Sequence, residues 1–177
     1  LDNVASRLVE MKRGPDGRTP DETVDGVGER AREQLARQSR LLSQELIPQL
    51  SEHGIHICHV EDLSSDQREE LSRIFHAQIY PVLTPLAVGP GRPFPYISNL
   101  SLSLAVLLRD PQLSQTTFAR VKVPKEILPR FVEIGDFLIP LEEVIADNLE
   151  ALFPGTEVVA CAAFRVTRDA DFTVSDE

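Results

Sequence analysis

The chain has 177 residues, of which 42% are hydrophobic, and its formal net charge at neutral pH is −10. This length and apolar content are enough for one packed core, with room for a smaller second unit. An acidic chain has no general attraction for nucleic acid or anionic lipid, so neither class of partner is expected.

The first 54 residues predict helices. The sequence predicts an amphipathic helix over residues 1–13, which the turn sequence of residues 14–17 should end. A longer helix is expected from about Glu22 to Glu52, with Pro48 kinking or tightening its last turn. Its apolar residues recur at a helical period, at Leu35, Leu42 and Leu46. Because the chain begins inside a helix without an initiator methionine, we expect it to be part of a longer protein.

Beyond Gly54 the pattern changes. Residues 55–60 alternate and are rich in β-branched side chains, which predicts a strand. Ser64 and Gln67 form a capping box that begins a helix, and Pro81 ends that helix. Five prolines follow Tyr80 within sixteen residues. They exclude a regular helix or a central strand and predict a rigid, extended connector.

The second half predicts mostly strands. Strands are expected over residues 100–109, 118–123, 129–134, 137–139 and 157–167. Gly135 and Asp136 separate two of them as a hairpin turn, and Pro140 begins a short helix with buried residues up to Leu152. The fold class is therefore α+β: N-terminal helices followed by a mostly antiparallel sheet flanked by two helices.

No common catalytic motif is present. The sequence lacks GxxxxGK[ST], GxGxxG, a nucleophile elbow and HExxH. His56 and His59 lie three apart in a predicted strand, so they point to opposite faces and cannot hold one metal together. Cys58 and Cys161 form no CxxC pair and are predicted to be small core residues in a reducing compartment. Because neither the cysteines nor the histidines have the spacing of metal ligands, we expect no metal site in this chain. With no transmembrane run and no signal-peptide core, we expect a cytoplasmic protein.

Basic residues gather weakly in the second half, at Arg120, Lys122, Lys125, Arg130, Arg165 and Arg168. Guanidinium groups suit phosphate oxygens, so the cluster is either a path for anions or a solvated sheet face. Arg165 interrupts an apolar run, and it either pairs with Asp169 or Asp171 or faces a ligand. Asn99 either caps the turn before its strand or contacts a ligand.

Several segments together resemble one family. They are YPVLTPLAV (80–88), PFPYISNLSLSLAV (93–106), FARVKVP (118–124), LPRF (128–131) and FRVTRDAD (164–171). In this order and spacing they are similar to the polyphosphate kinases that work through a phosphohistidine. The resemblance covers nearly the whole chain.

The resemblance implies an enzyme that transfers the terminal phosphate of ATP to inorganic polyphosphate. Such an enzyme has a helical N-terminal domain, a head domain and two phospholipase-D-like catalytic domains that carry the phosphorylated histidine. Residues 1–53 match the end of the N-terminal domain, and residues 54–177 match the head (middle) domain. None of the four histidines matches the catalytic motif, so no catalytic residue is expected here. ATP and Mg are implied for the parent enzyme, and no cofactor for this part.

In this family the head domain supplies dimer contacts and helps to wall the tunnel for polyphosphate. The resemblance therefore implies a homodimer and, as partners, the C-terminal catalytic domains of the same chain. Arg92, Asn99, Arg165 and Arg168 lie in the matching motifs and are candidates for the phosphate path. Two alternatives remain open from the residues alone: an autonomous anion- or nucleotide-binding module, and a protein–protein interaction domain without phosphate chemistry.

Overall fold

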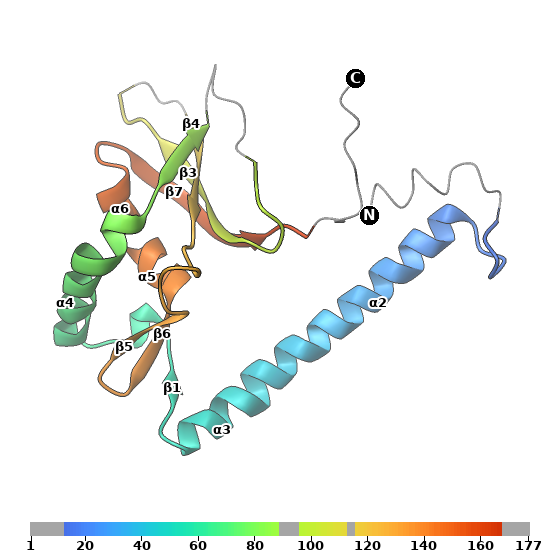
Figure 1. Ribbon diagram of the computed structural model, residues 1–177, viewed down its shortest axis with the longest axis horizontal. Coiled ribbons are helices and arrows are strands. Elements are labelled where there is room, and N and C mark those ends of the chain that lie inside the picture. Colours follow the sequence, from blue (N-terminus) through green and yellow to red (C-terminus); the bar gives the residue numbers. More distant parts are fainter. Residues whose placement is uncertain (1–12, 89–95, 113–115, 168–177) are drawn as a thin grey trace. The chain divides into compact units, whose positions relative to one another are not determined.

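The computed structural model describes residues 13–88, 96–112 and 116–167 (Figure 1). The chain divides into two compact units, Leu1–Gly54 and Ile55–Glu177, and each is described by itself. The helix predicted over residues 1–13 lies outside the described residues, apart from Arg13. None of the described helices combines the length and the apolar composition that crossing a bilayer would require.

The first unit contains one long helical segment, which begins with α2 (Pro20–Leu41). Its start is fixed by a capping box that the sequence analysis missed. The Thr19 hydroxyl accepts from the Glu22 N–H at 3.2 Å, and the Glu22 carboxylate accepts from the Thr19 N–H at 2.7 Å. The second bond is the main reason that the pKa of Glu22 is lowered. Pro20 occupies the first helical position, where its missing N–H leaves no bond unmade.

The helix predicted to run to Glu52 is interrupted. A π-helical turn, Leu42–Leu46, separates α2 from α3 (Ile47–Glu52), and the Ile47 N–H donates to the Leu42 carbonyl five residues back. Pro48 explains the turn, because its ring has no N–H and would clash with the carbonyl four residues back in a regular helix. The proline therefore widens the preceding turn, where the sequence analysis expected a kink or a tighter turn.

A second π-helical turn, Phe75–Ile79, follows α4 (Ser65–Ile74) in the other unit. Here the Tyr80 N–H donates to the Phe75 carbonyl, and the next residue is Pro81. The same local cause thus produces the same geometry twice. The predicted capping box at the start of α4 is confirmed, since Ser64 and Gln67 exchange bonds of 2.9 and 3.4 Å.

The leucine stripe of the first unit has no cover among the described residues. Leu35 is 62% exposed, and Leu42 and Leu46 are 50% and 44% exposed. None of the residues of α2 or α3 is buried. The helical period was therefore correctly predicted, but the described residues do not bury the apolar face.

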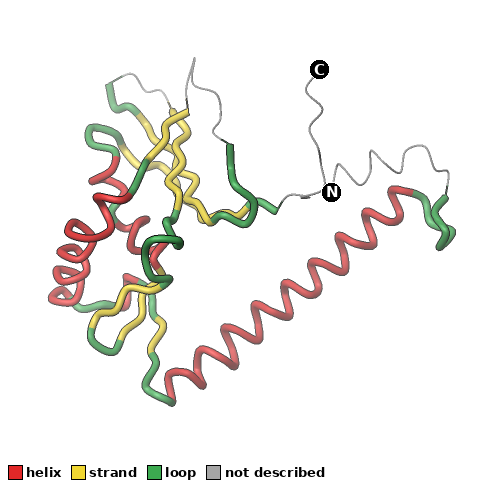
Figure 2. Tube along the Cα trace, in the orientation of Figure 1, coloured by secondary structure: helices red, strands yellow, loops and turns green. Residues whose placement is uncertain are grey.

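The second unit is built from short strands and helices (Figure 2). Besides α4 it contains β1 (His56–Ile57), β2 (Pro85–Val88), β3 (Leu102–Arg109), β4 (Thr116–Lys122), β5 (Phe131–Ile134), β6 (Phe137–Pro140), α5 (Leu141–Asp147), α6 (Leu149–Leu152) and β7 (Glu157–Arg165). The α+β class is confirmed. The connector after Tyr80 begins as a 3-10 turn and then forms β2, an edge strand that proline at its first position permits.

The strands form two sheets where the sequence analysis expected one. Sheet A has the order β1-β6-β5, with β1 parallel to β6, and sheet B has the order β2-β4-β3-β7, with every pair antiparallel. The predicted β5–β6 hairpin is present, and Gly135 adopts φ +57° in its turn. The alternation of residues identifies strands but not their partners, which explains why the division was not predicted.

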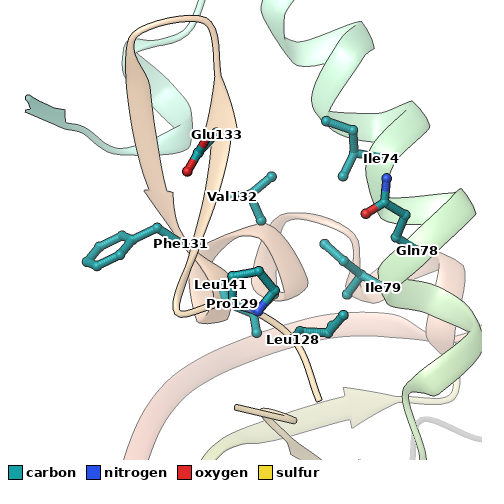
Figure 3. Close-up of a pocket in the computed structure, with 9 residues that line it drawn as sticks. All are labelled: Ile74, Gln78, Ile79, Leu128, Pro129, Phe131, Val132, Glu133 and Leu141. Carbon is teal, nitrogen blue, oxygen red and sulfur yellow. The ribbon is translucent and has the colours of Figure 1, made fainter. Parts of the chain in front are cut away.

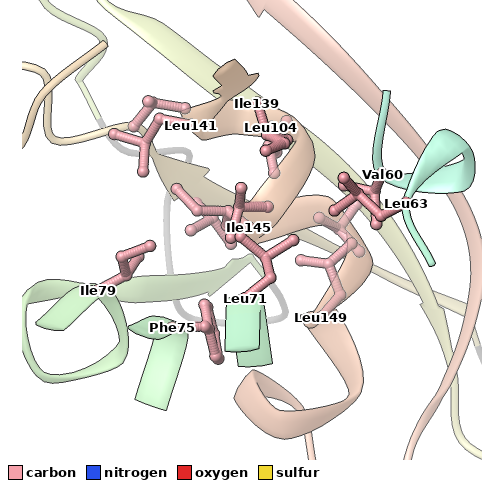
Figure 4. Packing of buried hydrophobic residues seen from close by; sticks show 14 of the residues in the cluster. Val60, Leu63, Leu71, Phe75, Ile79, Leu104, Ile139, Leu141, Ile145 and Leu149 are labelled. Carbon is pink, nitrogen blue, oxygen red and sulfur yellow. The ribbon is translucent and has the colours of Figure 1, made fainter. Parts of the chain in front are cut away.

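One core joins the two sheets (Figure 4). Leu104, Val106 and Leu108 of β3 point inward, as their alternation predicted, and are at most 4% exposed. They meet apolar residues from α4, the π-helical turn after it, α5, α6, β5 and β6, including Leu71, Phe75, Ile139, Ile145 and Leu149. Helices and sheets that are far apart in sequence are therefore held by one continuous apolar cluster.

Two local predictions were wrong. The strand expected over residues 55–60 is reduced to β1, because residues 60–62 turn into a 3-10 helix after His59, whose N–H donates to Asp62 at 2.9 Å. Cys161 was expected in the core but is exposed on β7, whereas Cys58 is partly buried. Burial nevertheless raises the pKa of both thiols.

Candidate functional site

The second unit contains a cavity of about 510 Å³ beside the end of sheet B, and three cationic side chains line it. Arg165 comes from the last position of β7, and Lys125 and Arg130 come from the connection between β4 and β5. The remaining wall is mostly apolar, with Leu100, Leu102, Val123, Leu141, Ala163 and Phe164, and includes one carboxylate, Glu142. Cations around a hollow with apolar walls make a site suited to an anion.

Arg165 is the best placed of the predicted site residues. It is exposed and pairs in register with Leu102 of β3, so its side chain lies on the face of sheet B that carries the core. Within the described part of the chain it makes no ion pair. The predicted partners Asp169 and Asp171 lie outside that part.

Arg130 is partly neutralised where it lies. Its guanidinium forms a two-pronged ion pair with the Glu142 carboxylate, and it stacks 5.3 Å from the centre of the Phe131 ring. The Arg130 carbonyl also accepts from the Leu141 N–H at 3.0 Å, which ties the connection to the start of α5. Lys125 lies with its Nζ 3.5 Å from the Leu100 carbonyl. Lys125 and Arg130 are thus held by contacts within the fold, and Arg165 is the cation of the lining that has no ion pair among the described residues.

The other predicted residues do not gather here. Arg92 and Arg168 lie outside the described residues. Asn99 is exposed in a turn that the Ser101 hydroxyl closes on the Ser98 carbonyl at 2.8 Å, and it does not line the cavity. Lys125 and Arg130 were noted in the sequence only as members of a weak basic cluster. The LPRF segment was a signal for Arg130, which it contains, whereas Lys125 lies in none of the segments that carry the family resemblance.

Arg120 was expected to lie on a solvated sheet face or along an anion path, and in the described structure it lies on neither. Its register partner is Ala105, so it points to the opposite face of sheet B from Arg165. It is only 5% exposed, donates to the Ser103 hydroxyl at 3.1 Å and to the Tyr96 carbonyl at 3.2 Å, and burial lowers its pKa. Arg120 therefore fixes the end of the proline-rich connector on the sheet.

A second cavity, of about 380 Å³, lies between the π-helical turn after α4 and the approach to β5 (Figure 3). Ile74, Ile79, Leu128 and Val132 dominate its wall, and Glu133 is the one charged residue in the lining. Because it has no cation, this cavity is a poor candidate for a phosphate ligand.

The histidines give no catalytic arrangement. His59 lies outside β1 and bonds through Nδ1 to the Glu143 carboxylate at 2.9 Å, which raises the pKa of His59. The pair is partly exposed, since 68% of the His59 side chain and 32% of the Glu143 side chain are accessible. Among the described residues, no three side chains of His, Cys, Asp or Glu gather as a metal site.

Comparison with known proteins adds two domain matches. A profile described as the polyphosphate kinase middle domain matches residues 66–177, and one described as the polyphosphate kinase N-terminal domain matches residues 2–58. A polyphosphate kinase of Mycobacterium ulcerans is 45% identical over 174 residues and one of Thermosynechococcus vestitus is 45% identical over 177 residues. These alignments cover 92% and 94% of this chain but only 23% and 24% of the relatives.

A solved structure is also similar. The crystal structure of polyphosphate kinase from Porphyromonas gingivalis superposes with a TM-score of 0.69 and 30% sequence identity. The superposition covers 79% of this chain and 25% of the other. The chain therefore spans about a quarter of the length of each protein that it matches.

Proposed function

Because this chain belongs to the polyphosphate kinase family, matching its N-terminal and middle domains, we propose that it is the non-catalytic supporting part of a polyphosphate kinase. The whole enzyme transfers the terminal phosphate of ATP to inorganic polyphosphate in the cytoplasm. Residues 1–53 end the N-terminal domain, and residues 54–177 form the head domain. This chain, which spans about a quarter of the length of its relatives, acts together with the catalytic domains of the same protein.

Within that enzyme, we propose that the cavity at Arg165 lies along the path of the polyphosphate chain. The single observation that carries this proposal is the meeting of Arg165, Lys125 and Arg130 around one hollow. Polyphosphate repeats its negative charge at every unit, so it gains from several cations spaced along a wall. Since the chain as a whole carries −10, the attraction is local and must weaken as salt rises.

ATP and Mg²⁺ bind outside this part in our proposal. The described residues offer no phosphate-binding glycine loop and no cluster of carboxylates that suits Mg²⁺. The purified chain should therefore form no polyphosphate from ATP. A substantial rate of ATP-dependent synthesis by the pure chain would refute the supporting role.

The cavity is tested by calorimetric titration with polyphosphate at low salt. We expect Arg165→Ala to weaken binding about fivefold, which corresponds to ~1 kcal/mol. Arg109→Ala is the matched control, because Arg109 is an exposed arginine of the neighbouring strand, is paired with Glu157 at 3.3 Å, and lies away from the cavity. Equal losses in the two variants would show that the attraction is not specific to the cavity.

The same titration separates the alternative of an autonomous anion-binding module. That reading is favoured by the same three cations and requires micromolar, salt-sensitive binding of ATP or polyphosphate by this chain alone. If this chain alone binds polyphosphate weakly and binds it more tightly in the presence of the catalytic domains, the result favours the non-catalytic supporting role instead.

A further inference from the structure

The cavity at Arg165 contains an anion of its own. Both terminal nitrogens of the Arg130 guanidinium donate to the Glu142 carboxylate, Nη1 to Oε2 and Nη2 to Oε1. Lys125 and Arg165, the other cations of the lining, make no ion pair within the described part of the chain. Glu142 is the one carboxylate among the residues that line this cavity. One of the three cations is therefore already engaged when the cavity is empty.

This ion pair uses the donors that a phosphate would need. A guanidinium binds a carboxylate or a phosphate through the same kind of two parallel N–H donors. An internal unit of polyphosphate carries one negative charge and two free oxygens, so it resembles the Glu142 carboxylate in charge and in shape. This edge of the Arg130 guanidinium can hold Glu142 or a phosphate unit, but not both at once.

Other contacts hold Arg130 without using this edge. Its guanidinium stacks 5.3 Å from the centre of the Phe131 ring, and its carbonyl accepts from the Leu141 N–H at 3.0 Å. The Arg130 side chain is 47% exposed, whereas that of Glu142 is 17% exposed. The guanidinium is thus the more accessible member of the pair, and an incoming anion meets it before it meets the carboxylate.

We propose that Glu142 is a built-in competitor that limits how tightly the cavity holds a polyphosphate chain. A chain held by Lys125 and Arg165 brings its next unit to Arg130 at a high local concentration, and this unit displaces the carboxylate. The exchange replaces one charge-assisted pair by another, so Arg130 guides the chain while adding little to the affinity. Conduction along a path requires binding that is weak enough to release what it carries.

The inference rests on the proposed path at this cavity and names the residue that regulates it. A structural role for Glu142 makes the opposite prediction. If the carboxylate positions Arg130 for the chain, its removal should weaken binding, as the removal of Arg130 itself should. If the carboxylate competes with the chain, its removal should strengthen binding. The sign of one measured change therefore separates the two roles.

The measurement is the rate at which the purified chain dissociates from immobilised long-chain polyphosphate at low salt. Glu142→Gln should slow dissociation about fivefold, the upper end for a partly exposed ion pair. Glu157→Gln is the matched control, because it also removes one negative charge and frees an arginine, Arg109, but does not line the cavity. The control should change the rate by less than about twofold.

A double variant tests the exchange itself. Arg130→Gln alone leaves Glu142 as an uncompensated negative charge in the wall, so it should weaken binding by about fivefold or more. Arg130→Gln combined with Glu142→Gln removes both charges and should bind within about twofold of the parent chain. Glu142→Asp, whose carboxylate is one methylene shorter, should dissociate at a rate between those of the parent and Glu142→Gln. It replaces Glu142→Gln if that variant does not fold.

Several results would overturn the inference. Unchanged or faster dissociation of Glu142→Gln shows that the carboxylate does not compete, and equal slowing in Glu157→Gln shows an effect of net charge alone. A double variant that binds as weakly as Arg130→Gln also refutes the exchange. In each case the proposed path stands if Arg165→Ala weakens binding more than Arg109→Ala does. Equal losses in those two variants, or no binding by any variant, refute the path and the inference together.

Discussion

Replacing Arg120 with methionine should destabilise the second unit by about 2 kcal/mol. The guanidinium is 5% exposed and donates to two neutral acceptors, the Ser103 hydroxyl and the Tyr96 carbonyl. Hydrogen bonds from a charged donor contribute about 1.5–3 kcal/mol each, or roughly 3–6 kcal/mol together. The buried guanidinium has no carboxylate partner among the described residues, so its burial has a desolvation cost that methionine avoids. This gain offsets part of the lost hydrogen bonds and leaves a net loss of about 2 kcal/mol.

Urea unfolding followed by tyrosine fluorescence measures this loss. The chain has no tryptophan and two tyrosines, Tyr80 and Tyr96, both in the second unit, so the signal excludes the long helix. With a slope of about 2 kcal/mol per molar urea, the midpoint should fall by about 1 M. Arg109→Met is the control and should shift it by less than about 0.25 M, because its ion pair is exposed. A midpoint for Arg120→Met equal to or above that of the parent chain would refute the reasoning, because desolvation would then outweigh both bonds.

Three further outcomes are expected. Because Glu143 raises the pKa of His59, the ion pair stabilises the fold fully below about pH 6.5, and this stabilisation is lost as pH rises through the raised pKa. Glu143→Gln should therefore lower the free energy of unfolding more at pH 5.5 than at pH 8.5. The difference should be less than about 1 kcal/mol, because the pair is partly exposed. Equal costs at the two pH values would contradict this. Pro48→Ala should restore a regular helix and slow amide exchange over residues 47–52; unchanged exchange would mean that the proline is not the cause of the π-helical turn. Phe75→Ala should cost about 3–5 kcal/mol by calorimetry, and Phe75→Leu much less; similar small losses would show that the core repacks around the site.

The sequence alone determined what depends on neighbours along the chain. The capping box at Ser64, the hairpin turn at Gly135 and the alternation of β3 were all predicted correctly, because each is decided within a few residues. The family was also identified from the sequence, since the PFPYISNLSL segment and its companions lie in order along one chain.

Only the tertiary structure decided which distant residues meet. The division into two sheets, the bond between His59 and Glu143, which are 84 residues apart, and the cavity shared by Arg130 and Arg165 all depend on packing. Strand alternation assigns each residue to one of two faces but does not identify the partner strand. That Arg120 and Arg165 lie on opposite faces of sheet B was therefore known only from the register. The same limit applies to β7, because whether a strand lies inside a sheet or at its edge is settled by the strands beside it.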